Sequence, residues 1–154
     1  MTERFTVELF SSEYAAAFKE LNLDWIERYF VVEPLDELLL SNPQEHFIDS
    51  GGQIVFAVQD DLVVGCCGIF KHTETVFEIS KMAVRPALQG LGIGRVLLDR
   101  AIEVAQSLGA ERLEIISSTR LKTALALYAS VGFVEVPLES DVYERGNIAL
   151  ELVL

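Results

Sequence analysis

The sequence predicts a domain of mixed α and β structure, in which helices pack on a mixed sheet. Its 154 residues match the usual length of one domain, so we expect residues 1–154 to fold as a single unit. Hydrophobic residues make up 51% and charged residues 23% of the chain, a composition that supports a core and argues against disorder. The spacing of apolar residues changes several times between the helical and the strand period, which indicates alternating elements.

Residues 1–34 are expected to hold one strand and two helices. Alternating side chains predict a strand over 6–9. Ser11 or Ser12 can cap the helix that follows, whose apolar residues recur at helical spacing. Asp24 is placed to start a second short helix and Pro34 to end it, because proline is poorly tolerated inside a helix.

Strands dominate the middle of the chain and alternate with helices toward its end. The acidic pair Asp60–Asp61 lies between two apolar runs and predicts the turn of a hairpin. Pro86 stands where a strand should stop, and Gly109 where a helix should stop. We expect strands over 53–59, 62–70, 75–84, 112–118, 133–136 and 147–154, and helices over 93–108 and 121–131.

The charge and the hydropathy of the chain exclude several functions. Its 12 basic residues face 24 acidic ones, and the net charge of −12 argues against a nucleic-acid partner. The longest nearly pure apolar run, Val63–Phe70, has 8 residues, whereas a membrane-spanning helix needs about 18. Residues 1–5 lack the basic and apolar stretches of a signal peptide, so we expect a cytoplasmic protein with no membrane partner.

Two segments carry a net positive charge, although the chain as a whole is acidic. Residues 81–100 carry a net charge of +3 and residues 117–130 a net charge of +2, which leaves −17 for the rest. Positive islands in an acidic protein indicate one anionic ligand that is held locally. Chance clustering on solvated helix faces explains the same charges equally well.

The two cysteines, Cys66 and Cys67, are neighbours in a predicted strand. Adjacent strand residues point to opposite faces of a sheet, which disfavours a disulfide between them. Two cysteines alone also make a poor zinc site. We therefore expect two small core residues in a reducing compartment, and no metal.

Three alternate glycines, Gly90, Gly92 and Gly94, stand between a predicted strand and a predicted helix. The first turn of a helix presents unpaired N–H groups, and glycines let a phosphate approach them, so the loop indicates an anion site. A dinucleotide fingerprint needs glycine where Arg95 stands, and a P-loop needs lysine there. The pyrophosphate pattern Gln/Arg-x-x-Gly-x-Gly/Ala fits, with Gln89 in its first position.

A second motif follows further along the chain, where Leu127-Tyr128 and Gly132-Phe133 are similar to a Leu-Tyr-x-x-x-Gly-Phe ending. Together with Gln89–Gly94 and the hairpin over 55–70, this motif makes most of the chain resemble the GNAT N-acetyltransferases. The resemblance implies a GNAT-like α/β (α+β) fold, with a mixed, mostly antiparallel central sheet. It also implies a splayed parallel strand pair and helices on both faces.

The resemblance implies an enzyme that transfers an acetyl group from acetyl-CoA, its co-substrate, directly to a primary amine of a small molecule or a peptide. In this family the pantetheine arm adds to a strand edge, which here is Met82, Ala83 and Val84. An asparagine that many members keep seven positions before the tyrosine is replaced by Leu121. The other cofactor-binding residues implied by the resemblance are Gln89, Gly90, Leu91, Gly92, Ile93, Gly94, Arg95 and Ala124.

Two candidates for proton transfer rest on the same resemblance. Tyr128 is similar to the tyrosine that protonates the departing thiolate, although some members use it only to orient the cofactor, and a packing residue is the other alternative. Glu78, four residues before Met82, matches a position where several members keep a glutamate that acts as a base. A solvated strand residue is the alternative for Glu78, and His46 and His72 are rival bases that are otherwise surface residues.

The sequence indicates the acceptor and the oligomeric state less closely than it indicates the cofactor. The first 61 residues hold 13 acids and 3 bases, and in this family that region forms the acceptor wall. An acidic wall suits a cationic amine, with ordinary solubilising charge as the alternative. Closing strands of small members often pair or exchange, so residues 149–154 lead us to expect a homodimer.

Two other classes of protein stay open. The same fold can keep the CoA site as a non-catalytic sensor or interaction module, which turnover of acetyl-CoA with amines distinguishes from an enzyme. The glycine loop can also belong to a nucleotide-binding regulator, for which we expect ATP or GTP binding that CoA does not displace.

Overall fold

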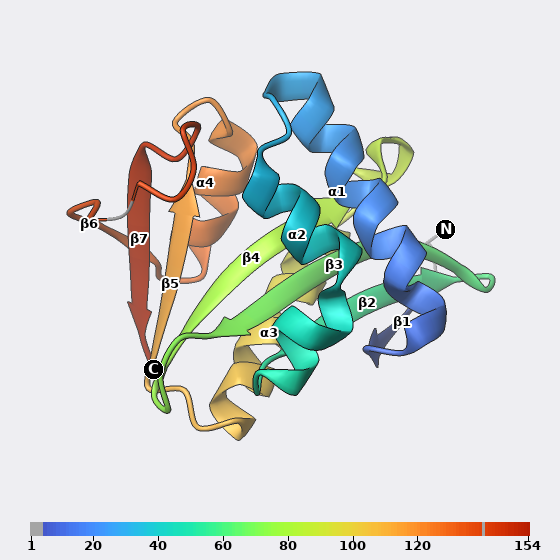
Figure 1. Cartoon of the computed structure of the whole chain (residues 1–154), viewed down its shortest axis with the longest axis horizontal. Coiled ribbons are helices and arrows are strands. Elements are labelled where there is room, and N and C mark those ends of the chain that lie inside the picture. The colour runs from blue at the N-terminus through green and yellow to red at the C-terminus, as the bar shows by residue number, and fades with distance from the viewer. Residues whose placement is uncertain (1–4, 140) are drawn as a thin grey trace.

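The computed structural model of the chain describes residues 5–139 and 141–154, and Figure 1 shows a central sheet with helices on both faces. Neighbouring strands are antiparallel except for one parallel pair, so the fold implied by the family resemblance is confirmed. The strand order is β1-β2-β3-β4-β5-β7-β6, with β1 (Thr6–Leu9), β2 (Gln53–Gln59), β3 (Leu62–Lys71), β4 (Val76–Val84), β5 (Arg112–Ser117), β6 (Val134–Val136) and β7 (Ile148–Val153).

Helices α1 (Ala15–Tyr29) and α2 (Pro34–Ser41) cover one face of the sheet, and α3 (Ile93–Ser107) and α4 (Lys122–Ser130) cover the other (Figure 1). Each face has its own cluster of buried apolar side chains. No helix within the described part of the chain is long and apolar enough to cross a membrane. The shorter helical segments are η1 (Ser12–Tyr14), the π-helix η2 (Gln44–Asp49) and η3 (Pro86–Leu88).

The expected break at Asp24 and the expected helix end at Pro34 are both wrong. Helix α1 continues through Asp24, whose carboxylate accepts a hydrogen bond from Arg28 one turn later at 2.9 Å. Pro34 begins α2 instead of ending a helix, because the first helical residue needs no intrahelical N–H partner. Glu33 caps α2, and Asp36 accepts the Glu33 N–H at 2.9 Å in a reciprocal capping box.

A β-bulge interrupts the middle of β4. Cys67 of β3 stands opposite two residues of β4, Lys81 and Met82, since the register of the two strands shifts at this point. Lys81 has a φ of 57°, in the left-handed region that non-glycine residues rarely adopt. A bulge bends its strand and increases the local twist, so the C-terminal half of β4 turns away from its earlier course.

The parallel strands β4 and β5 separate soon after they meet. They pair only over Val76–Glu78 and Arg112–Glu114, although β4 continues to Val84 and β5 to Ser117. The second half of β4 therefore presents an edge to β5 that carries no ladder between them. This divergence is the splayed parallel pair that the family resemblance implied.

Both cysteines lie in the core, as expected. Cys66 and Cys67 are free thiols with no exposed surface, and they belong to the apolar clusters on opposite faces of the sheet. Burial raises the pKa of the Cys66 thiol to about 12 and raises that of Cys67 as well. Neither thiol is therefore suited to nucleophilic chemistry.

Candidate active site

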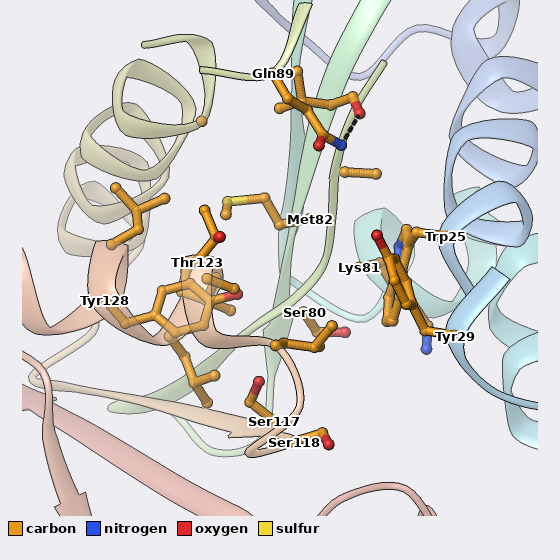
Figure 2. Close-up of a pocket in the computed structure, with 18 of the residues that line it drawn as sticks. Trp25, Tyr29, Ser80, Lys81, Met82, Gln89, Ser117, Ser118, Thr123 and Tyr128 are labelled. Carbon is orange, nitrogen blue, oxygen red and sulfur yellow. Dashed lines mark hydrogen bonds between the residues drawn. The ribbon is translucent and has the colours of Figure 1, made fainter. Parts of the chain in front are cut away.

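A cavity of about 540 Å³ opens where β4 and β5 separate. Figure 2 shows Tyr128 and Thr123 on one side of it, Trp25 and Tyr29 on the other, and Met82 between them. Its wall is made by α1, β4, the glycine loop, the end of β5, the start of α4 and the segment before β7. Polar and charged lining residues include Asp24, Arg28, Glu78, Lys81, Gln89, Arg95, Ser117, Ser118, Arg120, Lys122, Thr123, Tyr143 and Arg145.

The glycine loop forms one end of the cavity. Gly90 and Gly92 have φ values of 83° and 89°, which only glycine adopts without strain. A Cβ placed on either glycine would meet no atom within 4 Å, so this side of the backbone faces open space. The loop is therefore free to receive a bulky group against its main chain.

Helix α3 begins within this loop and points its N-terminus at the cavity. The Val96 N–H donates to the Gly92 carbonyl at 3.2 Å, while the N–H groups that precede it belong to the unpaired first turn. The Gln89 side chain donates to the Val84 carbonyl at 3.1 Å and ties the loop to β4 (Figure 2). Of the predicted loop residues, Leu91 alone lies outside the lining and is 57% exposed.

The edge of β4 forms the floor of the cavity, and all three residues expected to meet the pantetheine arm line it. Ala83 is buried among the residues under α1 and α2. Met82 and Val84 pack against the cluster under α3 and α4, as expected of alternating strand residues. Ala124 and Leu121, from the start of α4, also line the cavity.

Tyr128 reaches the cavity from α4, although only 8% of its surface is exposed. Its ring lies edge-to-face with Phe133 at 6.1 Å between centroids. Burial raises the pKa of the phenol well above its ordinary value, so the hydroxyl keeps its proton at neutral pH and is available as a donor.

Glu78 lines the cavity from β4, and its side chain is 16% exposed. Its neighbours Phe77 and Ile79 point into the core, so Glu78 faces away from them as predicted. Its Oε1 lies 2.7 Å from Nε2 of His72, the exposed histidine in the turn between β3 and β4. The other histidine, His46, sits on η2 and does not line the cavity.

A buried ionic cluster, which the sequence patterns did not reveal, lies beside the cavity. Asp36 is fully buried; its Oδ1 accepts a hydrogen bond from Lys81 Nζ at 2.7 Å, and both carboxylate oxygens accept from Arg145 at 2.6 and 2.8 Å. Lys81 also donates to the Tyr143 hydroxyl at 3.0 Å, and the Arg145 guanidinium stacks on Tyr143 and Trp25. Burial acts to raise the pKa of Asp36, but the two cations outweigh it and lower that pKa to about 2.

The expected acidic wall does not line the cavity. Of the described acidic residues among the first 61, only Asp24 lines it, and its carboxylate is paired with Arg28. The lining instead carries six cationic side chains against the two carboxylates of Asp24 and Glu78, and the cations are Arg28, Lys81, Arg95, Arg120, Lys122 and Arg145. Glu33 and Asp36 pair with Arg145 beside the cavity, and the other described acidic residues of this region lie elsewhere, which favours solubilising charge as their role.

Several known proteins are similar to this chain in sequence. The uncharacterized N-acetyltransferase YvbK of Bacillus subtilis is 32% identical over 116 residues, which are 73% of this chain and 75% of YvbK. The N-alpha-acetyltransferase RimI of Mycobacterium tuberculosis is 37% identical over 109 residues, which are 68% of this chain and 61% of RimI. The match thus spans less than two thirds of RimI.

Solved structures share the fold. An acetyltransferase of the GNAT family from Staphylococcus aureus superposes with a TM-score of 0.86 at 20% identity, covering 96% of this chain and 98% of that one. The acetyltransferase yncA of Salmonella typhimurium, solved with its cofactor acetyl-CoA, gives a TM-score of 0.75 at 20% identity over 98% and 94% of the two chains. The family model of the GNAT acetyltransferases matches residues 14–133, and the chain therefore belongs to this family of acyltransferases.

Proposed function

We propose that the chain is an acetyl-CoA-dependent N-acetyltransferase, which moves an acetyl group directly onto a primary amine of a small molecule or a peptide. The observation that carries the proposal is one cavity that joins the glycine loop, the open edge of β4, Tyr128 and Glu78. These are the parts needed to hold an acyl-CoA and to move protons at its thioester.

Residues of this chain suit acetyl-CoA, which supplies an activated acetyl thioester when bound. The open backbone at Gly90 and Gly92, next to the α3 N-terminus, suits a pyrophosphate. The edge of β4 at Met82–Val84 suits the amide groups of a pantetheine arm, which can bond to it as an added strand. Arg95 adds a positive charge at the loop, shared with Asp99 at 3.2 Å.

Tyr128 and Glu78 take the two proton-transfer roles. An acceptor ammonium has three N–H bonds and the amide product has one, so two protons leave the nitrogen. Glu78 accepts one of them. Tyr128 supplies a proton to the departing thiolate, and its phenolate takes up the second proton from the nitrogen, which restores the phenol. Direct transfer is supported by the burial of Cys66 and Cys67, which lie outside the cavity lining and so cannot carry the acetyl group.

The proposal extends to assembly and location. Residues 1–154 form one acetyltransferase domain, and the chain forms a homodimer in the cytoplasm, where two free thiols stay reduced. Strand β7 is paired on both sides over Ala149–Glu151, so β6 and the open end of β7 are the contact surface. Val134 and Val153 support this surface, since they are 61% and 73% exposed.

A turnover screen tests the enzyme assignment. Thiol release from acetyl-CoA is measured with a panel of amino acids, polyamines, aminoglycosides and lysine-containing peptides. We expect at least one amine to raise the rate above the hydrolysis seen without amine. A chain that binds CoA and acetylates no amine of the panel is a non-catalytic CoA-binding protein.

A further inference from the structure

Glu78 lies between the cavity and the protein surface, and His72 is its contact on the outer side. The two side chains join at 2.7 Å between Oε1 and Nε2, with Glu78 16% and His72 41% exposed. The imidazole also packs on the ring of Phe70 at 5.1 Å between centroids. An enclosed carboxylate is thus connected to water through one ring.

Other charged groups around this pair determine where a proton can go. Glu114 of β5 is in register with Glu78 and acts on His72 through its charge, while Lys71, next to His72, pairs with Glu74. The hydrogen bond with Glu78 raises the pKa of His72 above its ordinary value, and Glu114 acts in the same direction. On the cavity side of Glu78 the charged and titratable groups are Lys81, held by Asp36, and Tyr143.

We propose that His72 is the exit through which the proton taken up by Glu78 from the acceptor amine reaches water. This proposal rests on the proposed N-acetyltransferase function and on Glu78 as its base. His72 acts through Glu78 and does not touch the substrate, so it is a positioning and relay residue.

This route carries one proton from the acceptor amine to water in each turnover. An N–H bond of the acceptor breaks as an O–H bond forms on Glu78. That O–H bond then breaks as the proton moves to Nε2 of a neutral His72 ring, while the Nδ1 proton of the ring leaves to water. Glu78 is again a carboxylate, and one proton has reached solvent for each amide formed. Exchange of the ring protons with water then returns the exposed His72 to its starting tautomer.

The other polar neighbours of Glu78 are poorly placed for this exit. Lys81 has 3% of its side chain exposed and shares its charge with the buried Asp36, so it leads toward the interior. Tyr143 accepts a hydrogen bond from the same lysine, and burial raises the pKa of its phenol. Among the described residues, the imidazole of His72 is the group on Glu78 that titrates near neutral pH.

The test compares His72→Gln with His46→Gln, using the amine that turns over fastest in the panel described above. Glutamine keeps a donor toward Glu78 but cannot carry a proton through its side chain. We expect His72→Gln to lower kcat at pH 7 by about 10- to 100-fold, at or below the range of a direct proton transfer. His46→Gln, the matched control outside the cavity, should keep the wild-type rate.

Two readouts separate a relay from a merely structural contact. The wild-type rate should fall at low pH through a pKa above 6.5, where His72 becomes protonated, and this limb should be missing in His72→Gln. Added imidazole should raise the rate of His72→Gln and leave the wild type unchanged. Adding His72→Gln to Glu78→Gln should cost nothing further, because the ring acts only through that carboxylate.

The two proposals fail in different ways. A wild type that acetylates no amine overturns the enzyme assignment and the relay with it. A wild type that acetylates, alongside a His72→Gln variant with the same rate and the same pH profile, overturns the relay alone. A slow His72→Gln variant that imidazole does not rescue also overturns it, since a missing carrier is then not the cause.

Discussion

The environment of Tyr128 suits the proposed role of proton donor as much as its residue type does. Its ring is enclosed by apolar neighbours, and the raised pKa keeps the phenol protonated across the pH range in which amines become nucleophilic. The same enclosure holds the ring in place, so removal of the hydroxyl need not disturb the packing. Structure and chemistry of this residue can therefore be tested separately.

Replacing Tyr128 by phenylalanine should lower kcat by about 10²–10⁴-fold, because the thiolate then leaves without a proton donor. The affinity for acetyl-CoA should change little, since the ring remains. Tyr14→Phe is the matched control: its hydroxyl is bound to Glu8 at 2.6 Å, away from the cavity. Steady-state kinetics that give Tyr128→Phe the wild-type kcat would show that Tyr128 only packs.

The glycines of the loop from Gln89 to Gly94 make a specific test of the proposed pyrophosphate site possible. Gly92→Glu places bulk and negative charge in the open space where a pyrophosphate is proposed to sit. We expect the affinity for CoA to fall about 100-fold, the loss of one or two charge-assisted hydrogen bonds, as measured by calorimetry.

Gly92→Ala is the matched control for this variant, because both substitutions impose the same positive φ on a residue with a Cβ. The alanine variant should be destabilised to a similar degree while binding CoA much more tightly than the glutamate variant. Equal CoA affinities for two folded variants would place the pyrophosphate elsewhere.

Helix α2 and the β4 bulge are joined through Asp36, and this joint should matter for stability. Asp36→Ala leaves Lys81 and Arg145 without their shared buried partner, which typically costs about 3–5 kcal/mol of the free energy of unfolding. Glu37→Ala, on the same helix, removes an exposed pair with Lys19 and should cost at most about 1 kcal/mol. Urea unfolding of the two variants measures the difference.

The pH dependence of stability follows from the lowered pKa of Asp36. A carboxyl whose pKa falls from 3.8 to about 2 on folding stabilises the fold at every pH above 3.8. This contribution should be lost as the pH falls from 3.8 toward 2. Asp36→Ala should lack that acid step, and an acid transition as steep in the variant as in the wild type would contradict the assignment.

At the scale of the whole molecule, the exposed valines Val134 of β6 and Val153 of β7 lead to a prediction about assembly. Light scattering should give twice the chain mass of 17.1 kDa at micromolar concentration, because the proposed dimer covers Val134 and Val153. Val134→Lys should shift the mass toward 17.1 kDa without loss of folding. Val31→Lys is the control, because Val31 is 78% exposed but belongs to neither β6 nor β7, and this variant should leave the dimer intact.

Patterns within short stretches of sequence predicted most of the elements. The hairpin of β2 and β3 and the helix after the glycine loop follow from local periodicity and turn residues, and both lie where they were expected. Pro34 was misjudged because one proline can end a helix or begin the next, and only the capping carboxylates decide between these outcomes. The glycine loop could also be predicted from the sequence, because its residues are contiguous and form a local pattern.

The remaining part of the site depends on contacts between distant residues. Asp36 contacts Lys81, 45 positions away in the sequence, and Arg145, 109 positions away. Neither of these separations produces a local sequence pattern. A bulge at Lys81 that no sequence rule indicated, and the separation of β4 from β5, bring Lys81 and Arg145 to the cavity, with Asp36 buried beside them. Fold and family could be predicted from the sequence because hydrophobic period and motif are local. The charges around the cavity were instead decided by the tertiary structure, because burial pairs each ion with whichever partner the fold brings near.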